Sequence, residues 1–279
     1  MSTPEHGDAE VPDAQVLVKG DGPVRHVVLN RPGRHNAQTP QMWAGLAAAG
    51  RELSADPDVR CVILTGTGRS FSSGIDLGEF SRDDGFLRQL AARPAGDPDP
   101  MLADIAVAQD AVRWIPRAPF LVIGAVTGVA LGAGCQLALA CDVRIVAGDA
   151  RFALAEVSHG LLPDLGATAF LPRLIGRERA LDLMLTGREF SGTEAVSLGL
   201  ALRAVPSSAV LSTAQDYAEA VGRLPRAVPS YLKAAVDAAD VDRSLLVAAA
   251  GQAACIRAHP ALGGTGSDGH DRRDRGSAG

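Results

Sequence analysis

Residues 129–142 read Val-Ala-Leu-Gly-Ala-Gly-Cys-Gln-Leu-Ala-Leu-Ala-Cys-Asp. The stretch begins as the end of an apolar, β-branched run over residues 120–129 and passes through Gly132-Ala133-Gly134. It continues as a helix-forming Leu/Ala segment, so we predict a strand, a tight glycine turn and a helix. A helix N-terminus leaves backbone N–H groups without partners and carries partial positive charge. Because glycine lets a ligand approach the main chain, this turn is suited to an oxyanion.

The same stretch permits two simpler interpretations. Residues 118–141 carry no charge, and Gly124, Gly128 and Gly132 have the GxxxG spacing of membrane helix dimers. Four glycines, Thr127, Gln136 and the lack of a basic flank that would orient an insertion argue against a transmembrane helix, so we predict no membrane insertion. The glycines alone would equally fit a buried strand and helix that pack through small residues.

Composition limits the possible functions. The chain has 279 residues, enough for one large domain, and its net charge of −5 argues against nucleic acid as a partner. Residues 1–13 lack an apolar stretch and so do not form a signal peptide; we expect them to be disordered. The cysteines show neither CxxC nor Cys/His spacing, which predicts no metal site and buried thiols in a reducing cytoplasm. They are Cys61, Cys135, Cys141 and Cys255.

Strands and helices alternate up to residue 205, which predicts an α/β core over residues 14–205. Residues 81–100, rich in Asp, Arg and Pro, are predicted to form a mobile flap or a plain surface loop. Strands are predicted over residues 24–30, 59–65, 120–129, 143–147, 151–155 and 200–205. Helices are predicted from Thr39-Pro40 and over residues 101–115, 167–175, 178–185 and 191–198, with a loop at 156–164.

The pattern changes to helices alone after residue 206. Helices are predicted over residues 208–224, 229–239 and 242–258, so we expect residues 206–260 to form a helical oligomerisation segment. Residues 261–279 contain Gly, Asp, Arg, His and Ser without periodicity and are expected to be disordered.

A second glycine turn follows the strand predicted at 59–65. Its sequence, Gly-Arg-Ser-Phe-Ser-Ser-Gly-Ile-Asp-Leu-Gly at residues 68–78, lacks the Gly-Lys-Ser/Thr ending of a phosphate-binding loop. It therefore offers further backbone N–H groups after a strand.

Several motifs in order resemble the enoyl-CoA hydratase/isomerase (crotonase) family. They are Leu-Asn-Arg-Pro with Asn-Ala at residues 29–37, the two glycine turns, Gly-Leu-Leu-Pro-Asp at 160–164 and Leu-Pro-Arg-Leu-Ile-Gly at 171–176. The resemblance spans roughly residues 15–258 and implies a spiral of ββα units followed by a helical trimerisation segment. It also implies an acyl-CoA substrate with no separate cofactor, and homotrimers that often stack into hexamers.

The family's shared chemistry is stabilisation of a thioester enolate by two backbone N–H groups. Carried over by position, the resemblance assigns these donors to Ile75 and Ala133. It also implies that the backbone of residues 75–78 binds the CoA adenine. The implied CoA and substrate contacts are Arg34, Ala37, Ser73, Gly74, Ile75, Asp76, Leu77, Gly78, Gly132 and Ala133.

The departures from the family concern the acid/base groups. Hydratases of the family use two glutamates, and here Gln136 stands at the first position and Glu156 at the second. Glutamine cannot accept or deliver a proton in this way. Asp164 stands where hydratases more often have glycine, as in the dienoyl-CoA isomerase branch, although that branch carries aspartate where Gln136 lies. Read alone, Asp164 equally fits a surface carboxylate, and His159 fits a loop residue better than a base.

We therefore predict an acyl-CoA enzyme in which Glu156 acts as acid/base and isomerisation is favoured over hydration. The alternatives are an ordinary enoyl-CoA hydratase of fatty-acid degradation and a non-catalytic acyl-CoA-binding paralogue. Residues 261–279 cannot supply the basic CoA-phosphate contact of the usual C-terminal helix, which would leave that role to groups such as Arg34.

Overall fold

The computed structural model of the chain describes residues 14–259. The predicted disorder at residues 1–13 and 261–279 lies outside the described residues. The centre of the fold is a six-stranded sheet in the order β1-β2-β3-β4-β6-β9, parallel except for β1. Its strands are β1 Val16–Lys19, β2 Val24–Leu29, β3 Cys61–Gly66, β4 Leu121–Val126, β6 Val143–Ala147 and β9 Arg203–Val205.

A second, three-stranded sheet lies beside the first. It has the order β5-β7-β8 and contains β5 Val129–Leu131, β7 Arg151–Ala153 and β8 Phe190–Ser191. The single strand predicted over residues 120–129 is wrong, because Gly128, with φ of +62°, divides it into β4 and β5. A Cβ on Gly128 would lie 1.9 Å from the Arg69 carbonyl oxygen, so the backbones meet too closely for any side chain.

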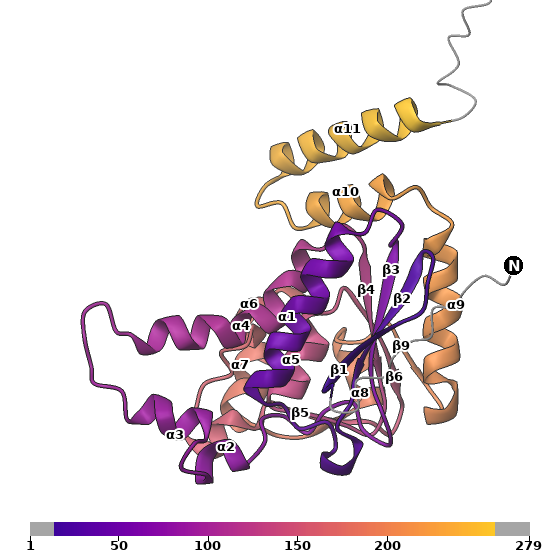
Figure 1. The fold of residues 1–279 in the computed structure, drawn as a ribbon. Helices are drawn as coiled ribbons and strands as arrows, with labels where there is room; N and C mark the ends of the chain where they lie inside the picture. Colours follow the sequence, from indigo (N-terminus) through magenta and orange to yellow (C-terminus); the bar gives the residue numbers. More distant parts are fainter. Residues whose placement is uncertain (1–13, 260–279) are drawn as a thin grey trace, which may run out of the picture.

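Helices cover both sides of the six-stranded sheet. Figure 1 shows α1 (Pro40–Ala55), α4 (Met101–Arg117) and α5 (Ala133–Ala140) on one side and α9 (Val210–Gly222) on the other. The predicted start of α1 is confirmed: the Thr39 hydroxyl accepts the Met42 N–H, and Pro40 occupies the first turn. The remaining α-helices up to α9 are α2 Gly78–Ser81, α3 Phe86–Ala91, α6 Ala167–Ile175, α7 Arg177–Thr186 and α8 Gly192–Leu198.

Three short 3-10 helices complete the described elements. They are η1 Pro32–Arg34, η2 Ala155–His159 and η3 Ser207–Ala209. The loop predicted at residues 156–164 is therefore partly wrong, because its first residues form η2. The loop predicted at residues 81–100 is also partly wrong, because the end of α2 and all of α3 lie within it.

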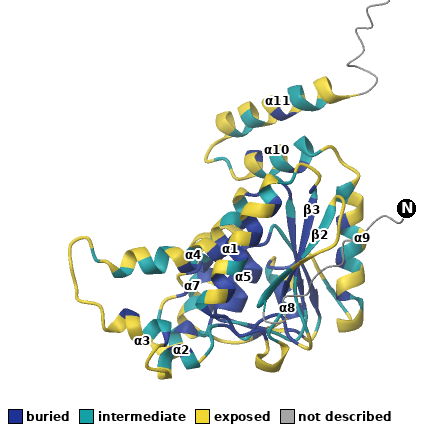
Figure 2. Ribbon diagram, viewed as in Figure 1, coloured by how far each residue is buried: buried dark blue, intermediate teal, exposed yellow. Residues whose placement is uncertain are grey.

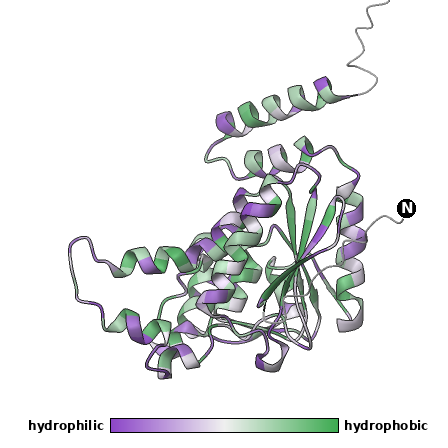
Figure 3. Cartoon of the chain, in the orientation of Figure 1, coloured by the Kyte–Doolittle hydropathy of each residue, from purple (hydrophilic) through white to green (hydrophobic). Residues whose placement is uncertain are grey.

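The hydrophobic core lies between the sheet and its helices. Figure 2 shows the central strands and α5 buried, and Figure 3 shows that β3 and β4 are mostly hydrophobic. In β3, residues 61–64 are buried, as expected for a strand covered on both faces. The thiols of Cys61, Cys135 and Cys141 are buried, and burial raises the pKa of Cys61 to about 12. Cys255 is only half-buried, which corrects the prediction for that residue.

The last two helices lie at one end of this core. Helix α10 (Ala227–Val236) and helix α11 (Val241–Ala258) pack against each other, and α11 lies at the outer edge of the molecule (Figure 1). Their exposed large apolar residues are Tyr231, Leu232, Val236, Val241, Leu245, Leu246 and Ile256. By contrast α9 packs on the sheet through Val210, Ala214 and Ala218. An oligomerisation role for this region stays a prediction.

Within residues 14–259, none of the helices is both long and apolar enough to span a membrane.

Candidate active site

The two glycine turns predicted from the sequence lie against each other. A Cβ placed on Gly74 would lie 2.7 Å from the Leu131 carbonyl oxygen and 3.6 Å from the Ala133 nitrogen. The Leu131 N–H donates to the Ser72 carbonyl oxygen at 3.0 Å, which ties β5 to the segment before Gly74. The two turns, which are about sixty residues apart in the sequence, therefore meet at this point of the structure.

Each turn contains one of the two backbone N–H groups predicted as oxyanion donors. The Gly74 carbonyl oxygen accepts the Gln38 N–H at 2.6 Å, and the Asp76 N–H donates to the Gln38 carbonyl oxygen at 2.8 Å. Because a trans peptide directs its C=O and N–H to opposite sides, the Ile75 N–H points away from Gln38. Ala133 is the first residue of α5, where the helix itself provides no acceptor for its N–H. A cavity of about 80 Å³ contacts both turns and Glu156.

Steric constraints explain the glycines of the second turn. Gly132 has φ of +51°, and a Cβ there would lie 3.3 Å from Glu156 Oε1. A Cβ on Gly134 would lie 2.3 Å from the Ser72 carbonyl oxygen. Gly132 is therefore needed for its positive φ, and Gly134 is needed for the close approach of the Ser72 backbone. These constraints go beyond the simpler interpretation, in which the glycines only allow a buried strand and helix to pack through small residues.

Gln136 and Glu156 form a buried, directed pair. The Gln136 amide nitrogen donates to Glu156 Oε1 at 2.7 Å, and the Gln136 amide oxygen accepts the Ala167 N–H at 3.2 Å. Because a backbone N–H can only donate, this second bond fixes the orientation of the amide. Glu156 Oε2 is buried and has no hydrogen-bond partner in the described structure. One carboxylate oxygen is thus held, and the other is available for a proton.

Burial is the main influence on the pKa of Glu156, the carboxylate of this pair. Desolvation raises the pKa of Glu156, the Gln136 hydrogen bond opposes that rise, and the charge of Asp164 adds to it. Desolvation also raises the pKa of Asp164, although this residue is exposed at the protein surface. A carboxyl group with a raised pKa is suited to exchanging protons near neutral pH.

A larger cavity of about 630 Å³ extends from this pair. Gln136, Glu156 and Asp164 all line it, so the structure brings together the three acid/base candidates predicted from the sequence. His159 lines it too and is exposed, with its ring 5.5 Å from that of Phe80. Most of the wall is apolar, comprising Trp43, Ile75, Phe80, Phe86, Leu87, Leu90, Met101, Ile105, Leu161, Leu162 and Leu165.

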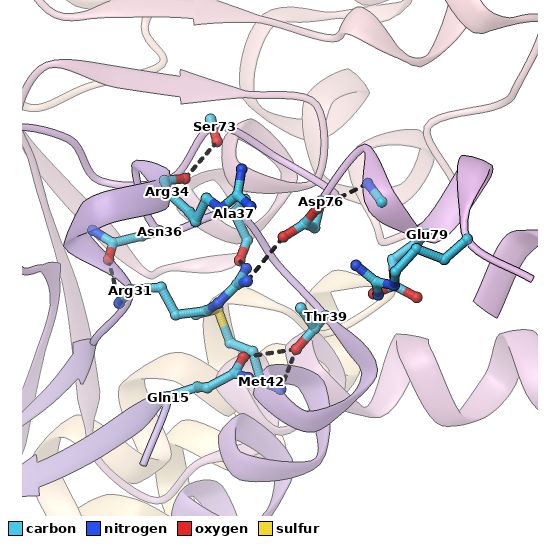
Figure 4. A network of polar contacts seen from close by, with 12 residues as sticks. Gln15, Arg31, Arg34, Asn36, Ala37, Thr39, Met42, Ser73, Asp76 and Glu79 are labelled. Atoms are coloured by element: carbon cyan, nitrogen blue, oxygen red, sulfur yellow. Dashed lines mark hydrogen bonds and ion pairs between the residues drawn. The ribbon is translucent and has the colours of Figure 1, made fainter. Parts of the chain in front are cut away.

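Four of the predicted CoA contacts, Arg34, Ala37, Ser73 and Asp76, lie close together in the polar network beside the first turn (Figure 4). The Ser73 hydroxyl donates to the Arg34 carbonyl oxygen at 3.4 Å, and the Gly78 N–H donates to Asp76 at 2.9 Å. Partial burial opposes ionisation of Asp76, but the Gly78 N–H and the Arg31 guanidinium lower its pKa. Leu77 is exposed, whereas Ala37 is buried with its carbonyl oxygen bound to Arg31.

Arg31 is a residue whose role the sequence did not reveal. Its guanidinium pairs with Asp76 at 2.9 Å and donates to the Ala37 carbonyl oxygen, so it joins the loop after β2 to the first turn. Arg31 belongs to the Leu-Asn-Arg-Pro motif, and this motif was the one feature of the sequence that could have pointed to it. Gln38 and Trp43 were also missed, because their contacts with the turn and the cavity arise only on folding.

The comparisons with known proteins establish the family. Residues 20–255 match the family model described as enoyl-CoA hydratase/isomerase, and the chain belongs to this family. The probable enoyl-CoA hydratase echA8 of Mycobacterium tuberculosis is 35% identical over 228 residues, covering 80% of this chain and 81% of that protein. The 1,2-epoxyphenylacetyl-CoA isomerase of Escherichia coli is 36% identical over 220 residues, covering 78% and 80%.

Solved structures agree with this assignment. A crystal structure from Thermobifida fusca YX, described as an enoyl-CoA hydratase in complex with acetoacetyl-CoA, has a TM-score of 0.76 and 35% identity. The alignment covers 86% of this chain and 94% of that one. The predicted family and crotonase-like fold are thereby confirmed, and the protein is an enzyme of the enoyl-CoA hydratase/isomerase family.

Proposed function

We propose that this chain moves the double bond of an enoyl-CoA thioester, with Glu156 as the acid/base and the Ile75 and Ala133 N–H groups as oxyanion donors. The observation that carries the proposal is the buried carboxylate of Glu156 beside Gln136. One of its oxygens is held by the amide and the other has no partner among the described residues. The acetoacetyl-CoA bound to the Thermobifida relative supports an acyl-CoA ligand.

The reaction needs one proton removed and one returned. Glu156 takes a proton from C2 of a 3-enoyl-CoA, and the electron pair moves into the thioester carbonyl to form a dienolate. The two N–H groups donate to the developing oxyanion, a contribution worth about 10²–10³ in rate for each donor. Return of the proton to C4 gives the 2-enoyl-CoA. This sequence requires no second acid/base group at position 136.

Asp164 is the proposed second carboxylate. It lines the same cavity as Glu156, and its negative charge raises the pKa of Glu156. Two neighbouring carboxyl groups can share a proton, since the charge of one keeps the other neutral. Asp164 thereby extends the distance along the acyl chain over which a proton can move.

Hydration is the second candidate, since the Mycobacterium tuberculosis relative is named as a probable hydratase. Hydration requires water to be deprotonated while a proton is delivered to the substrate, and Gln136 cannot take either part. Glu156 would have to perform both steps. We therefore expect hydration to be slow, although the oxyanion donors are the same.

The test compares Asp164→Asn and Glu156→Gln with wild type on a 3-enoyl-CoA and a 3,5-dienoyl-CoA. We expect Glu156→Gln to be nearly inactive on both thioesters and Asp164→Asn to impair the longer migration selectively. Asp182→Asn removes an exposed carboxylate that pairs with Arg188 and serves as the control. Equal migration rates in wild type and Asp164→Asn would remove Asp164 from the mechanism.

A further inference from the structure

A second buried carboxylate lies outside the acid/base pair. Glu79, in α2, has only 3% of its surface exposed, although several residues around it are exposed. Its Oε1 accepts a hydrogen bond from Arg82 at 2.5 Å, and its Oε2 accepts the Phe86 N–H at 2.8 Å. A buried charge needs partners of this kind for both oxygens. Glu79 therefore joins α2 directly to the first residue of α3.

The residues next to Glu79 form one wall of the large cavity. The Phe86 ring meets the Trp43 ring edge-on, with centroids 5.3 Å apart, and the Phe80 ring lies 5.5 Å from the His159 ring. Phe80, Phe86 and Trp43 all line the cavity. The position of this wall thus depends on how α2 and α3 are held together. Residues 78–91 contain both helices and overlap the flap predicted at residues 81–100; below, the flap means residues 78–91.

The flap is connected to the first oxyanion turn. The Trp43 indole N–H donates to the Gln38 side-chain oxygen at 2.8 Å, and the Gln38 backbone binds Gly74 and Asp76. Contacts therefore run from Glu79 through Phe86, Trp43 and Gln38 to the segment that carries the Ile75 N–H.

We propose that Glu79 is a positioning residue that sets acyl specificity by holding the flap against Trp43, and that the resulting cavity takes a large apolar acyl group. About 630 Å³ is the size of a site for a drug-sized ligand, and its wall is mostly aliphatic and aromatic. A short acyl group would leave much of this surface uncovered. The favoured thioesters are therefore of medium chain length or carry an aryl ring. The identity of the thioester ligand rests on the proposed function.

The test measures binding of butanoyl-CoA and dodecanoyl-CoA by titration calorimetry to wild type, Glu79→Ala and Glu79→Gln. Each buried methylene favours binding by about fourfold, so wild type should strongly prefer dodecanoyl-CoA. Glu79→Ala should reduce that preference by at least about tenfold, while the butanoyl-CoA Kd changes less than about twofold. Glu79→Gln keeps an acceptor for the Phe86 N–H and should fall between wild type and Glu79→Ala.

Asp84→Asn is the matched control, because Asp84 is an exposed carboxylate that also pairs with Arg82, at 3.4 Å. It should leave both affinities unchanged. Glu79→Ala combined with Phe86→Ala should lose no more preference than Phe86→Ala alone, because Glu79 acts on the cavity through Phe86. Equal weakening of both thioesters by Glu79→Ala, or no chain-length preference in wild type, would overturn the proposal. Because the saturated thioesters cannot isomerise, these results are independent of whether the proposed reaction occurs.

Discussion

Replacing Gln136 by glutamate tests the reason for preferring isomerisation. In the structure the Gln136 amide nitrogen lies 2.7 Å from Glu156 Oε1, and its oxygen accepts the Ala167 N–H. Gln136→Glu keeps the size of the side chain and the acceptor for Ala167. It replaces the donated amide hydrogen bond by a second carboxyl group at the same distance.

Two buried carboxylates this close cannot both be ionised, so the pair must hold a proton between them. One member is then a carboxylic acid and the other a carboxylate, which is what hydration requires. A single positioned acid/base group contributes about 10²–10⁴ in rate. We expect hydration of a 2-enoyl-CoA to rise by about 10²-fold, at the lower end of that range, because the new group must still share one proton with Glu156.

The assay follows loss of the conjugated thioester absorbance of a 2-enoyl-CoA in wild type and Gln136→Glu, with Gln136→Met as a control of similar volume. Gln136→Met removes the hydrogen bond without adding a carboxyl group and should not gain hydration. Ordinary family hydration rates in wild type, with no gain in Gln136→Glu, would refute the reasoning.

Three further predictions follow from the same geometry. Glu156→Gln should abolish turnover yet stabilise the protein. Because the pKa of Glu156 is raised by folding, the folded wild type binds more protons than the unfolded chain. The stability of the wild type therefore falls as the pH rises from the ordinary carboxyl pKa of about 4.3 through the folded value. The stability advantage of the variant in thermal melts should therefore grow over that window, and a constant difference would contradict the assigned shift. Gly134→Val should lower turnover by about 10²-fold or more with little change in circular dichroism. The reason is that the valine Cβ would lie 2.3 Å from the Ser72 carbonyl oxygen and displace the Ala133 N–H. Full activity of this variant would mean that the turn is only structural. The exposed apolar residues of α10 and α11 favour self-association, and the family resemblance implies that the assembly is a trimer. Light scattering should therefore give about three times the subunit mass, and a monomer at micromolar concentration would contradict this.

Much of the core could be predicted because local pattern determines it. The apolar run at residues 59–65 became β3, and the Thr39-Pro40 signal marked the start of α1. The short edge strand β1 was missed because four residues ending in Lys19 carry little pattern. The division of the 120–129 run was missed for another reason: the approach of Gly128 to Arg69 is a long-range contact that leaves no local signal.

Two kinds of feature in the candidate site could be predicted: turns whose backbone N–H groups do the chemistry, and a position that depends on the type of a single residue. The strand-glycine-helix pattern predicted the turn at Gly132 and Gly134, and the family resemblance pointed to Glu156. The structure places the turn and this carboxylate together. Arg31 and Glu79 could not be assigned, because their roles depend on partners that only the fold supplies. The predicted roles of Ile75, Ala133 and the CoA contacts stay predictions, supported by the arrangement of the two turns.

The most direct test of the central claim is the product formed by the wild-type protein from a 3-enoyl-CoA in oxygen-18 water, analysed by mass spectrometry. We predict a 2-enoyl-CoA with the mass of the substrate, formed much faster than any species containing heavy oxygen, and no product from Glu156→Gln. A wild-type protein that leaves the 3-enoyl-CoA unchanged, but converts a 2-enoyl-CoA to the labelled 3-hydroxyacyl-CoA, would contradict the claim that Gln136 directs this site toward isomerisation.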